Sequence, residues 1–391
     1  MDLPMLRERI ARWEDLHTEF KEWPIHADDL AAALVAFANT DGGQLVFGVN
    51  RDGQIVGVGD ADRAIQRVDQ IAYQNCEPPL TVIQETVNAE DGATALVVNI
   101  PKGDQRPYRT NSGVYFIRTT SGRRRASRQE LLRLFQASES LYYDEMLMLR
   151  ASLRDLDMNA LARYVEQVYQ RTLDEFDMTP ERLLRNLGLV KEQGGQPYPT
   201  IGCMLFFGRE PQRFLPQARV VLARIPGDDL AAAPSDVKTL DGGLPVMLED
   251  AARFLRIHLR VSHKIVGFEP EAQSELPEAA LREVLVNALA HRDYTIAAPV
   301  RVFVYDSSVE VRAPGALPNS VTVEAIRLRA AHVLRNPTIY TLFSNLGLVT
   351  GVGSGVYRAI QLVRQATGQE LELYHQGNEF VVSLPRPRSE P

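Results

Sequence analysis

The segment from Leu281 to Tyr294 combines the periodicity of a buried helix with a row of polar side chains. Glu283, Asn287 and His291 are spaced four residues apart, so in an α-helix they lie on one face. Most other positions are apolar, as expected of a helix that packs against a sheet. Because a buried polar group is costly without a partner, this row is expected to face a cleft or a ligand. The alternative is the solvated edge of an ordinary amphipathic helix.

Composition places the chain among ordinary globular proteins. At 391 residues it is too long for a single core, and its hydrophobic fraction of 45% and charged fraction of 24% are typical of folded proteins. Its apolar runs are too short to span a bilayer, and its N-terminus lacks the apolar core of a signal peptide. Cys76 and Cys203 lie far apart, which argues against a disulfide framework or a zinc site. We therefore expect a cytoplasmic protein without membrane contact.

The order of helix and strand patterns predicts a multidomain fold of mixed α+β or α/β class. Residues 1–140 contain helices and strands that suit one mixed sheet. Residues 141–275 are expected to form a helical and winged-helix-like connecting domain. Residues 276–385 begin with the polar-row helix and close with a hairpin, and residues 386–391 remain as a tail.

Further local patterns predict individual strands, a turn and a helix. Asn50-Arg-Asp-Gly53 is a hairpin signal, with Gln54 to Val58 as the returning strand. Val114 to Arg118 is expected to complete the N-terminal mixed sheet. In the connecting segment, Leu141 to Arg150 is predicted as a linker helix and the apolar run Ile201 to Phe207 as a strand.

A basic stretch near the end of the first segment stands out against the composition of the whole chain. The stretch has a local charge of +7 and no acidic residue, whereas the chain carries a net charge of −7. Its seven arginines are Arg106, Arg109, Arg118, Arg123, Arg124, Arg125 and Arg128. Guanidinium groups suit phosphate, and the interleaved Tyr108, Tyr115 and Phe116 could stack on bases. The pattern predicts a nucleic-acid surface without sequence specificity, and its alternative is a solvated edge.

A set of short motifs spans most of residues 13–135. The motifs are Glu14, Glu19-Phe-Lys21, Phe37-Ala-Asn-Thr-Asp-Gly-Gly43, Gly48-Val49, Gly53, Gly57-Val58 and Tyr115-Phe-Ile-Arg118. In this order they resemble the Schlafen-type, Alba-like domain. The resemblance implies an Alba-like mixed sheet that serves as a DNA-binding module, with RNA as the alternative partner.

The same resemblance suggests a second possible activity, metal-dependent cleavage of RNA. In Schlafen nucleases three acidic side chains bind a divalent metal and cleave RNA. Glu14 and Glu19 match the pair before Phe-Lys, and Asp52 is the best candidate for the third carboxylate. Three carboxylates could hold Mg²⁺ or Mn²⁺ and activate water. A metal-dependent RNA endonuclease, acting for example on tRNA, is therefore an alternative function.

Glycines near the C-terminus complement the polar-row helix. Gly351, Gly353 and Gly355 open a predicted helix, where backbone N–H groups can approach a phosphate. The chain also contains Asn287-Ala-x-x-His-Arg-Asp-Tyr294, Pro314-Gly-x-Leu-Pro318 and Arg335-Asn-Pro337. Together these motifs resemble the divergent form of the ATP-binding fold of the gyrase, histidine-kinase and MutL (GHKL) superfamily. The resemblance implies a GHKL-like α/β sandwich over residues 276–385.

Roles for individual residues follow from this resemblance. It implies that Glu283 is the base that orients water at the γ-phosphate and that Asn287 ligates the Mg²⁺ held by ATP. Gly351, Gly353 and Gly355 would cradle the phosphates, and Gly315, Arg335 and Asn336 would complete the cofactor site. The superfamily reads adenine with an Asp in an Asp-x-Gly motif, and this chain has Ala313 before Pro314-Gly315 instead.

These patterns together predict a nucleotide-responsive DNA-binding regulator of transcription. ATP and Mg²⁺ would bind in the C-terminal segment with weak hydrolysis, nucleic acid would bind in the N-terminal segment, and the chain would act as a homo-oligomer. One alternative is the metal-dependent endonuclease, and another is an assembly or scaffold protein with a degenerate nucleotide site.

Overall fold

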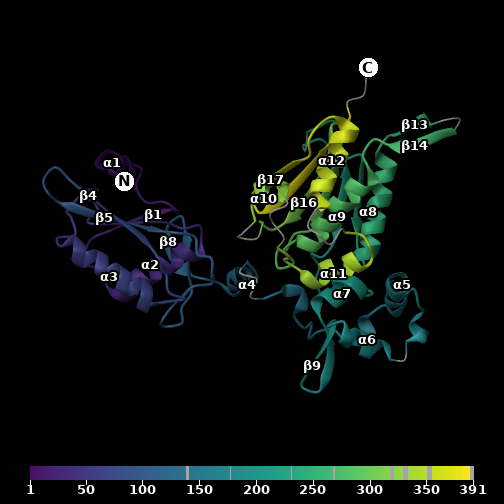
Figure 1. Cartoon of the computed structure of the whole chain (residues 1–391), viewed down its shortest axis with the longest axis horizontal. Coiled ribbons are helices and arrows are strands. Elements are labelled where there is room, and N and C mark those ends of the chain that lie inside the picture. The colour runs from purple at the N-terminus through teal and green to yellow at the C-terminus, as the bar shows by residue number, and fades with distance from the viewer. Residues whose placement is uncertain are drawn as a thin grey trace. The chain divides into compact units, whose positions relative to one another are not determined.

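The chain folds into two compact units, Met1–Leu141 and Tyr142–Pro391. The computed structural model describes residues 1–137, 141–176, 178–229, 231–266, 269–317, 321–328, 333–349 and 355–387. The fold is mixed α+β with several separate sheets, as the sequence predicts (Figure 1). None of the helices in the described ranges has the length and apolar character that crossing a bilayer requires.

A four-stranded mixed sheet forms the centre of the first unit. Its strand order is β1 (Thr18–Lys21), β2 (Gly43–Phe47), β5 (Thr94–Ile100) and β4 (Ile83–Asn88). β1 and β2 are parallel, whereas β5 is antiparallel to both of its neighbours. The apolar strands β2 and β5 lie in the middle and are buried on both faces, so they read as continuous apolar runs.

Helices cover both faces of this sheet. On one face α2 (Ala27–Asn39) and α3 (Ala61–Gln74) share a core with β2 and β5. On the other face α1 (Leu3–Arg12) contributes Leu6 to a smaller core. Every residue of α2 from Leu30 to Asn39 is buried, which explains its Ala-rich composition.

The remaining elements of the first unit are short. They are β3 (Cys76–Glu77), β6 (Arg109–Thr110), β7 (Phe116–Thr119), β8 (Gly122–Arg125) and α4 (Arg128–Ala137). The prediction that Val114 to Arg118 joins the main sheet is wrong, because β7 pairs only with β8. Asn39 explains this arrangement, since its amide nitrogen donates to the carbonyl oxygens of Tyr108 (2.7 Å) and Phe116 (2.9 Å) and holds this region at the end of α2.

The hairpin predicted at Asn50-Arg-Asp-Gly53 forms only as a turn. Gly53 N–H donates to the Asn50 carbonyl at 3.1 Å, and a single bridge joins Val49 to Ile55. Gln54 to Val58 does not continue as a strand, contrary to the prediction. The N–H groups of Val56 and Gly57 both donate to the Gly48 carbonyl, so the chain folds back tightly instead of extending beside β2.

The second unit begins with a region of short helices. They are η1 (Tyr143–Glu145), η2 (Leu153–Asp155), α5 (Met158–Tyr169), η3 (Leu173–Glu175), α6 (Pro180–Asn186), α7 (Ile201–Phe207) and η4 (Pro211–Arg213). A hairpin of β9 (Val190–Gln193) and β10 (Gln196–Pro199) lies between α6 and α7. The predicted linker helix over Leu141 to Arg150 is wrong, since that segment contains only the single turn η1.

Ile201 to Phe207 is a helix rather than the predicted strand. All seven residues of α7 are buried, so the segment has no polar face that would reveal a helical period in the sequence. Thr200 starts the helix, because its side-chain oxygen accepts a hydrogen bond from Cys203 N–H at 3.1 Å. The Thr cap was the available signal for a helix at this position.

A six-stranded sheet organises the rest of the second unit. Its order is β12 (Asp236–Leu240), β11 (Val220–Arg224), β15 (Val300–Val304), β16 (Ser308–Pro314), β18 (Glu379–Pro385) and β17 (Glu372–Gln376). Only the pair β11 and β15 is parallel. The sheet therefore joins strands from the segment before residue 275 with strands from the segment after it.

Three long helices lie side by side against this sheet, as Figure 1 shows. They are α8 (Leu244–His258), α9 (Glu278–His291) and α12 (Gly355–Thr367), with the shorter α10 (Val323–Arg327) and α11 (Pro337–Asn345) beside them. The hairpin of β13 (Val261–Val266) and β14 (Glu269–Ser274) connects α8 to α9. The helix α9 packs against α8, α11, α12 and β16, so it lies at the centre of the unit.

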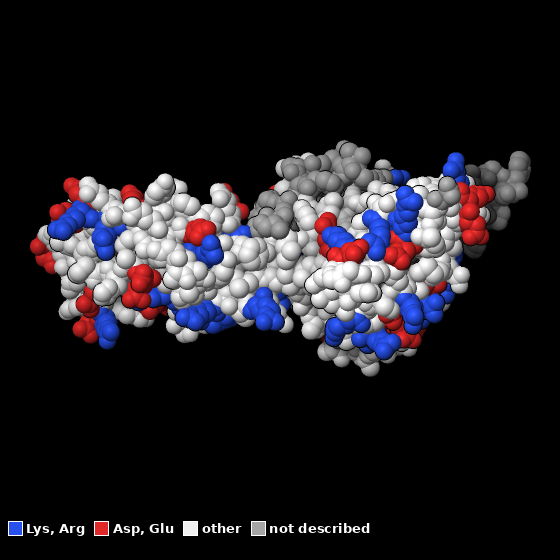
Figure 2. Space-filling model, turned by 90° about the horizontal axis from the view of Figure 1, so that it is seen from below, with Lys and Arg blue, Asp and Glu red and all other residues white. Residues whose placement is uncertain are grey.

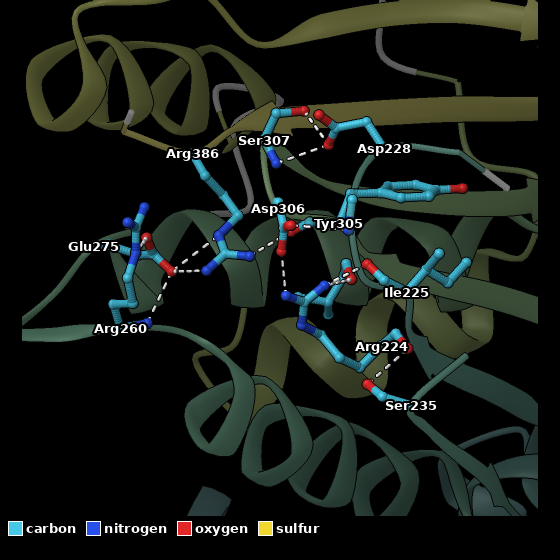
Figure 3. A network of polar contacts seen from close by, with 12 residues as sticks. Arg224, Ile225, Asp228, Ser235, Arg260, Glu275, Tyr305, Asp306, Ser307 and Arg386 are labelled. Carbon is cyan, nitrogen blue, oxygen red and sulfur yellow. Dashed lines mark hydrogen bonds and ion pairs between the residues drawn. The ribbon is translucent and has the colours of Figure 1, made fainter. Parts of the chain in front are cut away.

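Ion pairs of Glu275 join Arg386, just after β18, to the segment that leads into α9 (Figure 3). Arg386, which follows β18, donates to Glu275 Oε1 at 2.7 Å and to the carbonyl of Tyr305. Arg260 donates to Glu275 Oε2 at 2.8 Å. Burial opposes ionisation of Glu275, but these hydrogen bonds outweigh it and lower the pKa of its carboxyl group. The pairs fix the end of β18 beside the entry to α9.

Asp144 forms a polar contact inside the core of the second unit. It has no exposed surface, and its Oδ2 accepts a hydrogen bond of 3.0 Å from Ile339 N–H in the first turn of α11. Burial raises the pKa of Asp144 to about 7. The folded state therefore holds a proton on Asp144 that the unfolded chain releases near its ordinary pKa of 3.8.

This shift predicts a specific pH dependence of stability. A raised carboxyl pKa stabilises the folded state fully below about pH 4, and this contribution is lost as pH rises toward about 7. Between those limits the unfolding free energy should fall by about 1.4 kcal/mol per pH unit relative to an Asp144→Asn variant. Urea unfolding followed by circular dichroism at several pH values measures both slopes. Identical slopes for the two proteins would contradict the prediction.

Candidate functional site

A cavity of about 150 Å³ runs along α9 in the second unit. The described face of the sheet supplies an apolar wall of Val311, Ala313, Leu373, Phe380 and Val382. The polar lining consists of Glu283, Asn287, His291, Arg335 and Tyr340. The polar row predicted from the sequence therefore faces a cavity. It is not the solvated edge of an amphipathic helix, which was the alternative.

Glu283 and Asn287 are in direct contact at one end of the cavity. The Asn287 amide nitrogen donates to Glu283 Oε1 at 2.8 Å and to the Glu283 carbonyl at 2.7 Å. Burial raises the pKa of Glu283, while the hydrogen bond from Asn287 and the charges of Arg282 and Arg358 act in the opposite direction. Because its nitrogen is used by Glu283, Asn287 has its amide oxygen left for another partner.

Gly355 brings the first turn of α12 against this carboxylate. A Cβ built on Gly355 would lie 1.6 Å from Glu283 Oε1, so no other residue fits without displacing the glutamate. The N–H groups at the start of a helix lack helical partners and carry a partial positive charge. The Glu283 end of the cavity thus combines a half-buried carboxylate, an amide and the first described turn of α12. Gly351 and Gly353, which were predicted to share this role, lie outside the described residues.

Arg335 and Gly315 meet at the other end of the cavity. Arg335 Nη1 donates to the His291 carbonyl at 3.2 Å, and Nη2 donates to the carbonyl of Ala316. Gly315 has a φ of +113°, and a Cβ there would lie 2.4 Å from Arg335 Nη1, so glycine is needed for this close approach. The ring of Tyr340 lies 5.9 Å from that of His291.

Asn336 is close to this site but does not line the cavity. It is buried, and its amide nitrogen donates to the carbonyls of Ala290 (2.8 Å) and Arg292 (3.0 Å). It therefore satisfies the last carbonyls of α9, which have no partners within the helix. Its predicted part in a cofactor site is at most indirect, through the position of α9.

The structure thus brings Glu283, Asn287, Gly315, Arg335 and Gly355 together around one cavity. Sequence reasoning missed Tyr340 and the apolar wall. The signal for the wall was available, because alternate residues of β16 and β18 are apolar and must point to the same face. Burial and the negative charge of Glu283 raise the pKa of Tyr340, which places the phenol within electrostatic reach of that carboxylate.

The seven arginines of the stretch from Arg106 to Arg128 do not form one basic surface. Arg106 and Arg118 are buried, and Arg118 pairs with Glu19 and lies 4.4 Å above the ring of Phe37. Arg109 pairs with Glu77 (2.9 Å), Arg123 with Asp29 (2.6 Å) and Arg124 with Glu130 (2.7 Å). Arg125 and Arg128 are exposed, and neither has an ion pair within the described ranges. On the face in Figure 2, basic and acidic side chains are mixed.

Of the three carboxylates proposed for a nuclease site, Glu14 and Glu19 have partners within the first unit, and Asp52 is exposed. Glu19 is buried and pairs with Arg118, with Lys21 (2.9 Å) and with Arg123 (3.7 Å). Glu14 accepts the Phe20 N–H at 2.9 Å, and Asp52 is exposed in the turn after Asn50. Over the described part of the chain, no three His, Cys, Asp or Glu side chains are grouped so that they could hold a metal ion.

Both the N-terminal and the C-terminal regions of the chain match known protein families. Residues 14–127 match the Schlafen, AlbA_2 family. Residues 297–384 match the family described as "Putative ATP-dependent DNA helicase recG C-terminal". Residues 132–221 match a domain of unknown function. The chain therefore contains a Schlafen AlbA_2 domain and a RecG-related C-terminal domain, whereas a search of curated proteins found no match.

Solved structures add information on the fold. The crystal structure of the DIP2311 protein from Corynebacterium diphtheriae is similar over 99% of this chain and 80% of that chain, with 22% identity and a TM-score of 0.51. At this identity the likeness concerns the fold alone. The NMR structure of the N-terminal domain of a "Putative ATP-dependent DNA Helicase RecG-related Protein" from Nitrosomonas europaea matches 28% of this chain and 78% of that chain, with 26% identity and a TM-score of 0.23.

The contact between Gly355 and Glu283 gives a prediction for the second unit. Gly355→Ala should lower the unfolding free energy by about 1–3 kcal/mol, because the added methyl group must displace the half-buried carboxylate. The same substitution in a Glu283→Ala background should cost less than about 1 kcal/mol, since the clash is absent there. Urea unfolding of the four proteins in this double-mutant cycle tests the contact. An equal cost in both backgrounds would show that the two residues do not contact each other.

Proposed function

We propose that the protein is a nucleotide-responsive DNA-binding regulator. The cavity of the RecG-related domain binds ATP with Mg²⁺, and the Schlafen AlbA_2 domain contacts nucleic acid. The observation that carries the proposal is the pairing of Glu283 and Asn287 opposite the first turn of α12. The description of the matched C-terminal family as an ATP-dependent enzyme supports the same interpretation.

The phosphates fit the Glu283 end of the cavity. The first described turn of α12 lies against the Glu283 carboxylate, and N–H groups at the start of a helix suit an anion such as a phosphate. Mg²⁺ prefers hard oxygen ligands, and the Asn287 amide oxygen is one that Glu283 does not use. When bound, the ion would neutralise phosphate charge. Asn287 would hold it, while its nitrogen keeps the carboxylate of Glu283 in place.

Glu283 is the proposed base for hydrolysis. A base works best when its pKa is close to the working pH, and burial moves the pKa of Glu283 in that direction. Its Oε1 is oriented by Asn287, so the second oxygen, Oε2, is available to accept a proton from a water molecule. Because the base must be ionised, turnover should increase as pH rises through its pKa.

The predicted test of this role is a Glu283→Gln variant. Glutamine keeps the size and the hydrogen bond to Asn287 but cannot accept the proton, so turnover should fall by about 100-fold or more. Nucleotide affinity should change by less than about threefold. Phosphate release and isothermal titration with Mg²⁺ and ATP measure the two quantities. Normal hydrolysis by the variant would refute the role, and absence of binding of any purine nucleoside triphosphate at millimolar concentration in the unmodified protein would refute the proposed function.

Nucleic-acid contact is assigned to the Schlafen AlbA_2 domain through Arg125 and Arg128. These two arginines are exposed without ion pairs in the described ranges, so phosphate can approach them without displacing a carboxylate. The paired arginines would first have to give up an acidic partner. Regulation then requires that ATP and DNA affect each other's affinity, and thermodynamic linkage makes this effect equal in both directions.

Salt dependence distinguishes the two groups of arginines. Replacing both Arg125 and Arg128 by alanine should weaken binding to duplex DNA and reduce the slope of log K against log salt by about two. The matched control replaces Arg109 and Arg124, which pair with Glu77 and Glu130, and should change the slope by less than one. Fluorescence anisotropy with a labelled duplex gives both slopes. Equal effects of the two double variants would contradict the assignment.

A further inference from the structure

The two ends of the α9 cavity differ in hydrogen-bonding character. Glu283 and His291 are eight residues apart, or about 12 Å along the helix axis. The Glu283 end suits the phosphates of a nucleoside triphosphate, as proposed above. The rest of the ligand, including its base, must then extend toward Arg335, Gly315 and the apolar residue Phe380, which pairs with Ala313 in the sheet.

The acceptors at the Arg335 end each accept a hydrogen bond from the protein. The Pro314 carbonyl accepts from Asp293 N–H at 2.8 Å, and the carbonyls of His291 and Ala316 accept from Arg335. Asp293 is buried, and its Oδ1 accepts from both the backbone N–H and the hydroxyl of Thr295. Among the described residues that line the cavity, the one carboxylate is Glu283, at the opposite end.

Arg335 leaves this end with a surplus of donors. A guanidinium group has five N–H donors, and its two bonds to carbonyls use only two of them. No ion pair between Arg335 and a carboxylate occurs within the described ranges. The two carbonyls and the backbone of Gly315 also fix the orientation of the group, so the remaining donors are held in place. A ligand group at this end must therefore offer acceptors.

We propose that the cavity selects a 6-oxopurine nucleotide, such as GTP or ITP, over ATP. This inference rests on the proposed function for the phosphate end and concerns only the base. A 6-oxopurine presents O6 and N7 as adjacent acceptors, which match the fork of a guanidinium group. Adenine keeps the N7 acceptor but presents an amino group in place of O6, so one donor of Arg335 would face a donor and lose its partner. The apolar wall of Phe380 stacks on either base and does not distinguish them.

The test compares three nucleotides on the unmodified full-length protein. Isothermal titration with ATP, ITP and GTP, each with Mg²⁺, should give at least about tenfold tighter binding for ITP and GTP than for ATP. ITP and ATP differ at the 6-position, so their ratio isolates the proposed contact. Equal affinities, or tighter binding of ATP, would overturn this inference while leaving nucleotide binding intact. Absence of binding by all three at millimolar concentration would instead refute the proposed function.

An Arg335→Lys variant refines the assignment. Lysine keeps the positive charge but loses the planar fork, so the preference for ITP over ATP should shrink to less than about threefold. The matched control is Arg364→Ala, because Arg364 is exposed on α12 and pairs with Glu370 outside the cavity. The control should keep the full preference. An unchanged ITP preference in Arg335→Lys would show that another group reads the base.

Discussion

The architecture of the second unit depends on how the C-terminal end of α9 is held. The last carbonyls of this helix are not closed by a glycine but by side chains from a distant loop, through Asn336 on Ala290 and Arg292 and through Arg335 on His291. The buried Arg292 continues the anchor with bonds to the carbonyls of Gln217 (2.9 Å) and Ala298 (2.6 Å). These bonds at one end, together with packing against α8, α11, α12 and β16, hold α9 with Glu283 and Asn287 facing the cavity. Within the motif His291-Arg-Asp-Tyr294, Arg292 therefore has a structural part, whereas the His291 side chain lines the cavity.

In the first unit, acidic residues that are distant in the sequence neutralise several arginines of the basic stretch. No acidic residue lies between Arg106 and Arg128 in the sequence. Arg124 pairs with Glu130 just beyond this stretch, and the fold brings Glu19, Asp29 and Glu77 to other arginines from 32 to 99 residues away. Burial also determines what an ion pair contributes to the protein. Glu19 and Arg118 are both about 5% exposed, and a buried pair of this kind contributes to the uniqueness of the fold more than to attraction for a polyanion.

Local sequence patterns predicted many of the helices and strands and the polar row of α9. The predictions failed for two reasons, which are burial on all sides of a helix and contacts between residues far apart in the sequence. The polar row of α9 was predictable because three residues at one helical spacing differ from an otherwise apolar background. Its pairing with Gly355 followed from a family resemblance and not from spacing, since 72 positions separate Glu283 from Gly355. The α7 segment failed because burial on all sides removes any period, and the role of Asp144 could not be predicted because its partner Ile339 is 195 residues away.

The boundaries of the family match and of the folded unit do not coincide, and this affects how the protein can be divided. The match to the RecG-related family covers residues 297–384, which contain β15 to β18. The helix that carries Glu283 ends before that match begins, and β11, which pairs with β15 in the middle of the sheet, is further upstream. Asp144, near the start of the unit, accepts a hydrogen bond from the backbone of α11, the helix that carries Tyr340 of the cavity lining. A fragment cut at the edges of the match would lose the polar row and β11, whereas the compact unit that contains them begins at Tyr142.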